Sequence, residues 1–112
     1  MSKFQECLET YDKEFKKLKI KYDDKLLTKV AKGCGPSIYN KDSSKVSSGD
    51  PAEMDRVRKN FLIKKLGLKD TPKLDEGMAA VVTQLGKSNR NKYRAMFYYL
   101  LVKHFRKASM YK

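Results

Sequence analysis

The side chains with the chemistry for catalysis are few in this sequence, and their spacing does not assemble an active site. Its one histidine, His104, is the single candidate for a general base. At about 100° per residue, a helix over the last segment places His104 in its most apolar sector, beside Phe97 and Leu101. A lone histidine in such a sector predicts a hydrogen-bonded core residue and not a catalytic group.

Neither the acidic pairs nor the cysteines supply a catalytic group. The adjacent acids at positions 23–24 and 75–76 point in different directions on a helix, which fits helix caps and first-turn acids better than paired catalytic carboxylates. Cys7 and Cys34 are too few for a disulfide framework, and nothing beside them in the sequence activates a thiol. The sequence shows no metal-binding Cys/His spacing and no glycine-rich phosphate motif. It therefore predicts no catalytic residue, no metal site and no cofactor, hence a binding protein and not an enzyme.

Two cations stand in the apolar sector of the helix expected over residues 50–66. Arg58 and Lys65 are seven residues apart, so an α-helix places both on its apolar side. A cation there must extend to solvent, pair with an acid or bind an external anion. One interpretation is a clamp between Arg58 and an acid of the preceding segment, Asp42 or Asp50. The other is a phosphate site, in which both cations act with loop hydroxyls. The hydroxyls in question belong to Ser43, Ser44, Ser47 and Ser48.

The helix expected over residues 92–107 carries cations among aromatic rings. It is apolar on nearly every side, which predicts a helix at the centre of the core. Rings interleaved with cations could also stack on nucleic-acid bases. Tyr98 and Tyr99 cannot both face one core, so the one that faces outward is the better candidate for a ligand contact. The cations assigned to anion binding in this segment are Arg90, Lys92 and Arg94.

Turn and capping residues divide the chain into about five helices. These are expected over residues 2–22, 24–32, 50–66, 72–85 and 92–107. The clearest start is Asp50 followed by proline, with Glu53 in the position that completes a capping box. Gly77, inside the fourth helix, predicts a close helix crossing. No strand-like alternation occurs, so the expected fold class is all-α, a compact single-domain bundle over residues 1–112.

The first helix bears a regular apolar stripe. Its apolar residues are spaced alternately four and three apart, which is the pattern of one helix face and also of a coiled-coil seam. The helix either packs on its own domain or offers the stripe to a protein partner or a second copy of the chain. In the second case residues 1–22 are an extension of a core over residues 24–107. The stripe consists of Phe4, Leu8, Tyr11, Phe15, Leu18 and Tyr22.

Charge is the least ordinary property of the chain. The formal net charge is +13, and a field of that sign attracts nucleic acid and other polyanions. Lysine-rich surfaces also act simply to keep a protein dissolved. No apolar run approaches the roughly 18 residues of a membrane span, and the first residues lack the features of a secretory signal. We expect a cytoplasmic protein without a membrane partner.

Two segments carry a resemblance to a known family. They are residues 41–68, which include Ser-Gly-Asp-Pro-Ala-Glu-Met-Asp-Arg, and residues 90–101, Arg-Asn-Lys-Tyr-Arg-Ala-Met-Phe-Tyr-Tyr-Leu-Leu. Here the chain resembles an uncharacterised family of short, mainly bacterial proteins that is known as a domain of unknown function. The resemblance covers roughly residues 24–107. It implies a compact helical cytoplasmic protein and brings no activity, cofactor or site residue with it.

The sequence supports two hypotheses about function. The first is a small basic binding protein that contacts nucleic acid, or a nucleoprotein or virion particle, through its charged surface. The alternative is a protein–protein interaction module or structural subunit that uses the stripe of the first helix.

Overall fold

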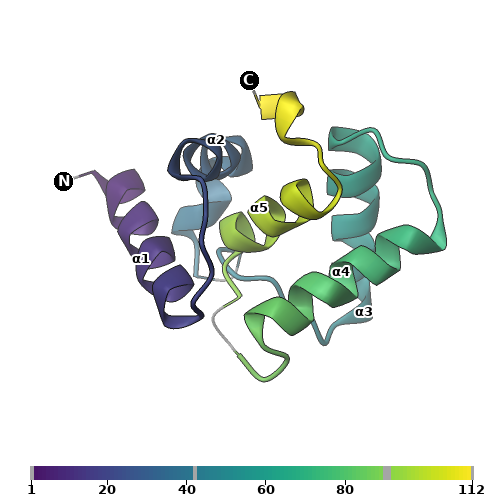
Figure 1. Ribbon diagram of the computed structural model, residues 1–112, viewed down its shortest axis with the longest axis horizontal. Helices are drawn as coiled ribbons and strands as arrows, with labels where there is room; N and C mark the ends of the chain where they lie inside the picture. Colours follow the sequence, from purple (N-terminus) through teal and green to yellow (C-terminus); the bar gives the residue numbers. More distant parts are fainter. Residues whose placement is uncertain (1, 42, 90–91, 112) are drawn as a thin grey trace.

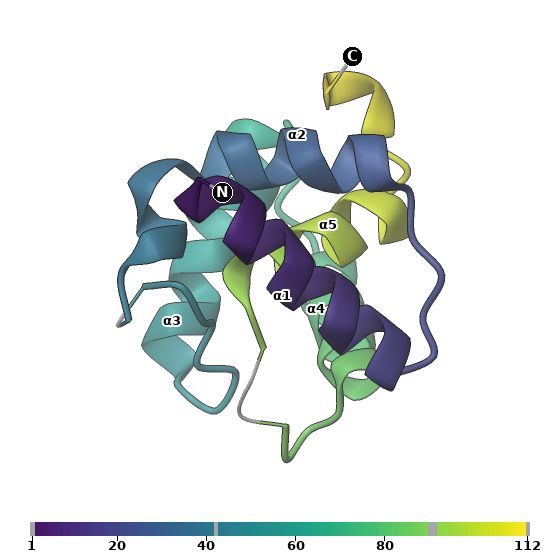
Figure 2. The ribbon, with the colours of Figure 1, turned by 90° about the vertical axis from the view of Figure 1, so that its left-hand side faces the viewer.

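The computed structural model describes residues 2–41, 43–89 and 92–111, and its regular secondary structure is helical. α5 runs through the middle of the molecule, with α1 and α2 on one side and α3 and α4 on the other (Figure 1). Seen from the α1 side, α2 lies above α1, and α5 passes behind both (Figure 2). The radius of gyration is 13.0 Å, the value expected of one compact domain of this size. The predicted all-α fold of about five helices is confirmed. The helices are α1 (Lys3–Lys17), α2 (Asp24–Cys34), α3 (Pro51–Arg56), α4 (Pro72–Leu85), α5 (Arg94–His104) and the shorter or wider turns η1 (Gly35–Tyr39), η2 (Val57–Lys65) and η3 (Ala108–Tyr111).

α5 is the central core helix that its apolar composition predicts. Every residue from Ala95 to Val102 is buried except Tyr98, which is half-buried. Tyr99 is 2% exposed, and its hydroxyl accepts a hydrogen bond of 2.7 Å from the backbone N–H of Asp23, the N-cap of α2. Tyr98 is thus the outward-facing member of the tyrosine pair.

The apolar stripe of α1 faces the protein's own core. Tyr11 and Phe15 are fully buried, so an interface role for these two side chains is wrong. The helix also ends earlier than expected, because the chain leaves it through Lys19 at a φ of 60°. Tyr22 therefore lies outside the helix and folds back to stack on Phe15, with ring centroids 4.7 Å apart. The remaining stripe residues are half-buried against the same core; they are Phe4, Leu8 and Leu18.

The start of α3 follows the local signal of the sequence. The Asp50 carboxylate accepts a hydrogen bond of 3.0 Å from the backbone N–H of Ala52, and proline occupies the first helical position. The capping box itself is not completed. The backbone N–H of Asp50 donates to the Ser47 carbonyl, and the Glu53 carboxylate turns instead to two arginines.

The third helix widens after Arg56 into the π-helical turn η2. The backbone N–H of Leu66 donates to the carbonyl of Phe61, five residues earlier, at 2.9 Å. Such a turn holds more residues than an α-helical one. Residues seven apart, which share a face in an α-helix, therefore diverge here. This change of winding decides where Arg58 and Lys65 point.

Gly77 marks a close crossing, as predicted. It is buried, and a Cβ atom at this position would lie 2.3 Å from Cζ of Phe105, at the end of α5. His104 does not occupy the core. It is exposed because it is the last residue of α5, past the edge of the apolar cluster, and its ring meets that of Phe105 edge-on at 4.9 Å. Among the described residues no helix is long and apolar enough to cross a membrane.

Candidate anion-binding surface

Arg58 is a clamp, but its acids come after the helix and not before it. Its guanidinium donates to the carboxylate of Asp70, and its Nε lies 3.4 Å from Oδ1 of Asp75, at the start of α4. Asp50 is occupied with its cap, and Asp42 lies outside the described residues. Arg58 thus ties η2 to α4. The structure does not bring Arg58 into one site with Lys65 and the loop serines: Arg58 faces Asp70 and Asp75, whereas Lys65 and Ser43 line a different pocket.

Arg94 joins three separate segments. Its Nε donates to the Ser43 carbonyl at 2.7 Å, its Nη1 to the Tyr98 hydroxyl at 2.8 Å and its Nη2 to Oε1 of Glu53 at 2.9 Å. The Arg94 and Glu53 side chains are 15% and 13% exposed. Partial burial opposes ionisation of Glu53, yet hydrogen bonds from Arg56 and Arg94 hold its pKa below the usual value. Arg94 is therefore a neutralised, structural cation.

The predicted serines are also used internally. The Ser43 hydroxyl donates to the Ser37 carbonyl at 2.9 Å, and the Ser44 hydroxyl to the Lys41 carbonyl at 3.5 Å. These bonds fold the serine-rich loop onto itself. Their hydrogens are thus not offered to an external phosphate.

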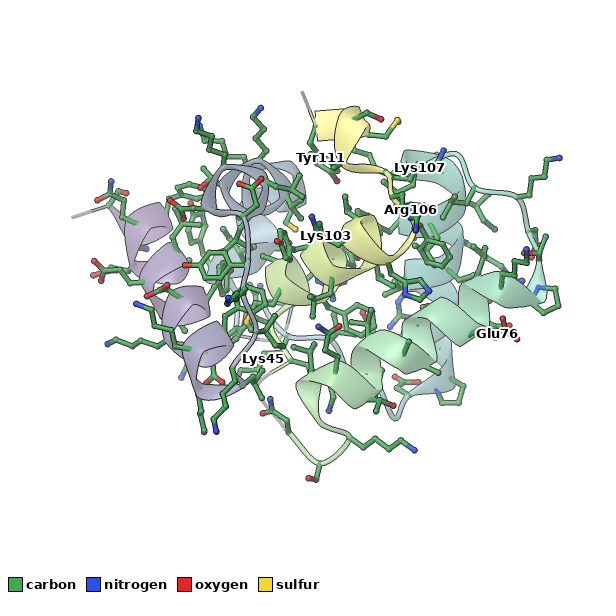
Figure 3. All side chains as sticks on the ribbon, in the orientation of Figure 1. Lys45, Glu76, Lys103, Arg106, Lys107 and Tyr111 are labelled. Carbon is green, nitrogen blue, oxygen red and sulfur yellow. The ribbon has the colours of Figure 1, made fainter. Side chains whose placement is uncertain are left out.

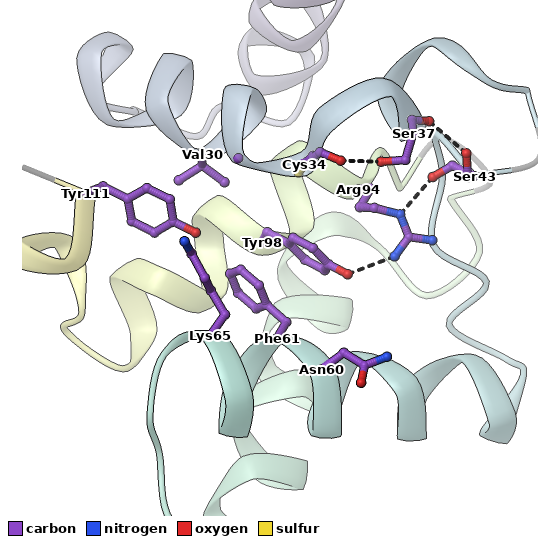
Figure 4. A pocket seen from close by; sticks show the side chains of 11 residues that line it. Val30, Cys34, Ser37, Ser43, Asn60, Phe61, Lys65, Arg94, Tyr98 and Tyr111 are labelled. Atoms are coloured by element: carbon purple, nitrogen blue, oxygen red, sulfur yellow. Dashed lines mark hydrogen bonds between the residues drawn. The ribbon is translucent and has the colours of Figure 1, made fainter.

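A pocket of about 380 Å³ lies beside the Arg94 cluster (Figure 4). It brings together Lys65, Ser43 and Arg94 from the predicted set. The Tyr98 ring stacks on Phe61 in its wall, with centroids 3.9 Å apart. Another wall is the ring of Tyr111, whose centroid lies 5.5 Å from Nζ of Lys65.

Tyr111 is not among the predicted site residues, because it lies beyond the last expected helix. The sequence signal that could have indicated it is an aromatic side chain in the short segment after the last expected helix. In the structure Tyr111 packs against the core and faces α2 at Gly33.

Cys34 also lines this pocket, and burial raises the pKa of its thiol to about 11. The Cys7 thiol contacts the Ile38 carbonyl at 3.8 Å, and burial raises its pKa as well. Both cysteines are free thiols. Because thiolate is the reactive form, neither environment favours nucleophilic chemistry. Among the described residues no three His, Cys, Asp or Glu side chains gather in a way that could hold a metal ion.

The serine-rich loop lies against the segment that leads into α5. The backbone N–H of Val46 donates to the Lys92 carbonyl at 2.8 Å, and that of Arg94 donates to the Ser44 carbonyl at 2.7 Å. These two bonds form an isolated antiparallel bridge between Lys45 and Tyr93. A hollow of about 550 Å³ opens beside the bridge, and we call it the lysine hollow. The described residues that line it include no acid; they are Lys41, Lys45, Val46, Ser47, Ser48, Lys87, Ser88, Asn89 and Lys92.

Lys92 lines the lysine hollow and is 4% exposed. Its ammonium donates to the carbonyls of Lys87 and Asn89 at 3.0 and 2.5 Å. Within the described ranges no carboxylate lies within ion-pair distance of it. Burial lowers its pKa, because the charged form loses hydration. Among the described residues, only neutral carbonyl groups therefore hold this buried cation.

A second group of cations lies at the end of α5. Figure 3 shows Lys103, Arg106 and Lys107 near that end, away from Lys45. Cations in this position stabilise the negative end of the helix dipole, which explains them without a ligand. In the lysine hollow Lys87 likewise follows the end of α4, whereas Lys41 and Lys45 lie in the serine-rich loop, away from the end of an α-helix. Arg90, also predicted to bind anions, lies outside the described residues.

Comparison with known proteins identifies a family but no activity. A family described as "Protein of unknown function (DUF2853)" matches residues 10–109. The match begins inside α1, so it includes the buried residues Tyr11 and Phe15, which the resemblance seen in the sequence left out. No curated protein is similar enough to this chain to match it.

Proposed function

The chain belongs to this family of proteins of unknown function, and we propose that it binds nucleic acid or a related polyanion at the lysine hollow. The observation that supports the proposal is Lys92, a buried ammonium with two carbonyl partners and no ion-paired acid within the described residues. An external phosphate near it would supply the missing negative charge. The role is binding and not catalysis, in the cytoplasm that the sequence predicts.

The wall of the hollow suits a phosphate backbone. Lys41 and Lys87 are exposed at its rim, and Ser47 and Ser48 line the same space. Lysine offers a point charge without the planar fork that reads a base edge. We therefore expect contacts to phosphates, which position a nucleic acid without selecting its sequence.

The bridge between the loop and α5 gives the hollow a fixed shape. Its two backbone hydrogen bonds hold residues 44–46 against residues 92–94. Lys92 ties the preceding turn to the same place through two further bonds. A site that is already ordered loses less entropy on binding than a flexible tail of equal charge.

The alternative, a protein interface on α1, has a weaker basis. Such an interface needs the apolar stripe to face outward, and its two central residues, Tyr11 and Phe15, are core residues of the chain itself. The outer face of α1 mixes both signs of charge, as in the ion pair of Lys16 and Asp12 at 2.9 Å. That face offers no apolar seam to a partner.

The test is a salt titration of binding to labelled duplex DNA and single-stranded RNA, measured by fluorescence anisotropy. The variant is Lys41→Gln/Lys87→Gln. The matched control, Lys25→Gln/Lys29→Gln, removes the same charge from exposed positions of α2, which lies at the opposite end of the molecule from the segment after α4 (Figures 1 and 2).

We expect binding to weaken steeply with salt. The hollow variant should lower the DNA log–log slope by about 2, because each phosphate contact contributes about 0.9. The control should keep the slope of the wild type. Equal losses in both variants would show a general charge effect, and no binding near physiological salt would show a solvated surface; either result would refute the proposal.

A further inference from the structure

The pocket beside Arg94 differs from the lysine hollow in the ligand it can hold. At about 380 Å³ it falls at the small end of the range for small-molecule sites, roughly 300–1,000 Å³. Aromatic rings form much of its surface, namely the stacked pair of Phe61 and Tyr98 and the ring of Tyr111 (Figure 4). Such walls favour a flat ring, which gains offset-stacked or edge contacts with them.

Among the described residues around the pocket, one positive charge has no acidic partner. Arg94 is neutralised by Glu53 at 2.9 Å. Lys65 has no acid within ion-pair distance among the described residues, and the pocket lining contains no Asp or Glu. The Lys65 ammonium is instead placed over the Tyr111 ring. A ligand with a single negative charge balances this arrangement.

The two phenols of the pocket lie at different sides of it, Tyr98 beside Arg94 and Tyr111 beside Lys65 (Figure 4). The Tyr98 hydroxyl accepts from Arg94, which leaves its own hydrogen free to donate. Burial raises the pKa of Tyr98, although Arg94 opposes the shift, and burial raises the pKa of Tyr111 to about 12. Both phenols therefore keep their hydrogens at neutral pH. Figure 4 shows the Tyr111 hydroxyl directed toward Lys65.

From these observations we propose that the pocket binds a small aromatic carboxylate. Its ring lies among Phe61, Tyr98 and Tyr111, and its carboxylate accepts hydrogen bonds from Lys65 and the Tyr111 hydroxyl. This site is separate from the lysine hollow.

The test uses benzoate as the probe and the full-length ¹⁵N-labelled protein. We expect saturable amide shifts in the lining segments 33–37, 60–65 and 94–98. Lys65→Met should weaken benzoate binding about tenfold, the effect of losing one charged hydrogen bond. Lys64→Met, an exposed neighbour outside the lining, should bind as the wild type does. Tyr98→Phe, which keeps the stacking ring, should weaken binding less than Lys65→Met.

Matched probes decide which part of the ligand matters. Benzyl alcohol lacks the charge and should bind at least tenfold more weakly than benzoate. Inorganic phosphate lacks the ring and should cause no saturable shift in these segments. The proposal would be overturned if benzyl alcohol or inorganic phosphate bound as tightly as benzoate. It would also be overturned if Lys65→Met bound benzoate with unchanged affinity, or if the amide shifts were confined to other segments. Nucleic-acid binding should be unaltered in Lys65→Met, so this proposal and the proposed function fail independently.

Discussion

Lys92 and Arg94 are two residues apart, and both carry a largely buried positive charge, yet their surroundings treat that charge differently. Arg94 reaches across the molecule to Glu53, to the Ser43 carbonyl and to the Tyr98 hydroxyl. Lys92 bonds two carbonyls of the turn just before it. Arg94 is neutralised by a carboxylate, whereas Lys92 has no carboxylate partner among the residues that the structure describes.

The difference follows from the geometry of the two side chains. Guanidinium has five N–H donors in a fixed plane, so one Arg94 can join a helix, a loop and an acid at once. An ammonium is a compact charge that two nearby carbonyls can hold. Burial alone therefore does not separate a structural cation from a functional one. The partner of the cation separates the two cases. A cation paired with an acid stabilises the fold, whereas a cation without an acidic partner still attracts an anion.

The largest expected effect is the loss of the Arg94 pair. Arg94→Met leaves the Glu53 carboxylate, 13% exposed, with Arg56 as its remaining partner and removes the link to the serine-rich loop. We expect the free energy of unfolding to fall by about 2–3 kcal/mol. Urea unfolding followed by circular dichroism measures it.

The control is Arg58→Met. Arg58 also pairs with acids, but Asp70 and Asp75 are 64% and 65% exposed, so water replaces the lost contact. The expected loss is about 1 kcal/mol or less. If the two arginine variants lose equal stability, the special role of the Arg94 cluster is refuted.

A smaller effect is expected at Lys92. Lys92→Met removes the donor from the carbonyls of Lys87 and Asn89, and it also removes the penalty of burying a charge. We expect a net loss of about 1 kcal/mol in urea unfolding. Lys87→Met, whose own side chain is exposed, should change stability by less than about 0.5 kcal/mol. A Lys92→Met protein as unstable as Arg94→Met would show that the two cations are equally structural.

The sequence predicted the features that neighbouring residues encode. Asp50 followed by proline sets the start of α3, Gly86 follows the end of α4, and Gly77 marks the crossing with the end of α5. Each depends on capping chemistry or on the missing Cβ of glycine, which a short stretch of sequence contains in full.

The candidate sites were harder to predict, because they depend on winding and on distant partners. The prediction that Arg58 and Lys65 share a helix face assumed α-helical turns, whereas the turns of η2 are wider. Glu53 was assigned to a local cap, whereas its partner Arg94 lies on another helix. The stripe of α1 was ambiguous in principle, since a core face and a partner seam have the same spacing. The way the chain folds back at Tyr22 resolves it, and that contact is not local.

The smallest expected effect is an opposite response of the two regions to alkaline pH. Burial lowers the pKa of Lys92 below 10.5, so the unfolded chain holds that proton more tightly, and stability linked to Lys92 rises with pH toward 10.5. Burial raises the pKa of Tyr98 above 10.0, with Arg94 in opposition, so the folded chain holds that proton more tightly, and stability linked to Tyr98 falls as pH passes 10.0. Urea unfolding of the wild type, Lys92→Met and Tyr98→Phe from about pH 9 to about pH 11 measures both trends. The advantage of the wild type over Lys92→Met should grow with pH, and its advantage over Tyr98→Phe should shrink. If the two stability advantages of the wild type changed in the same direction with pH, one of the two groups would not have the burial described. The contrast between a neutralised and an uncompensated region would then be refuted.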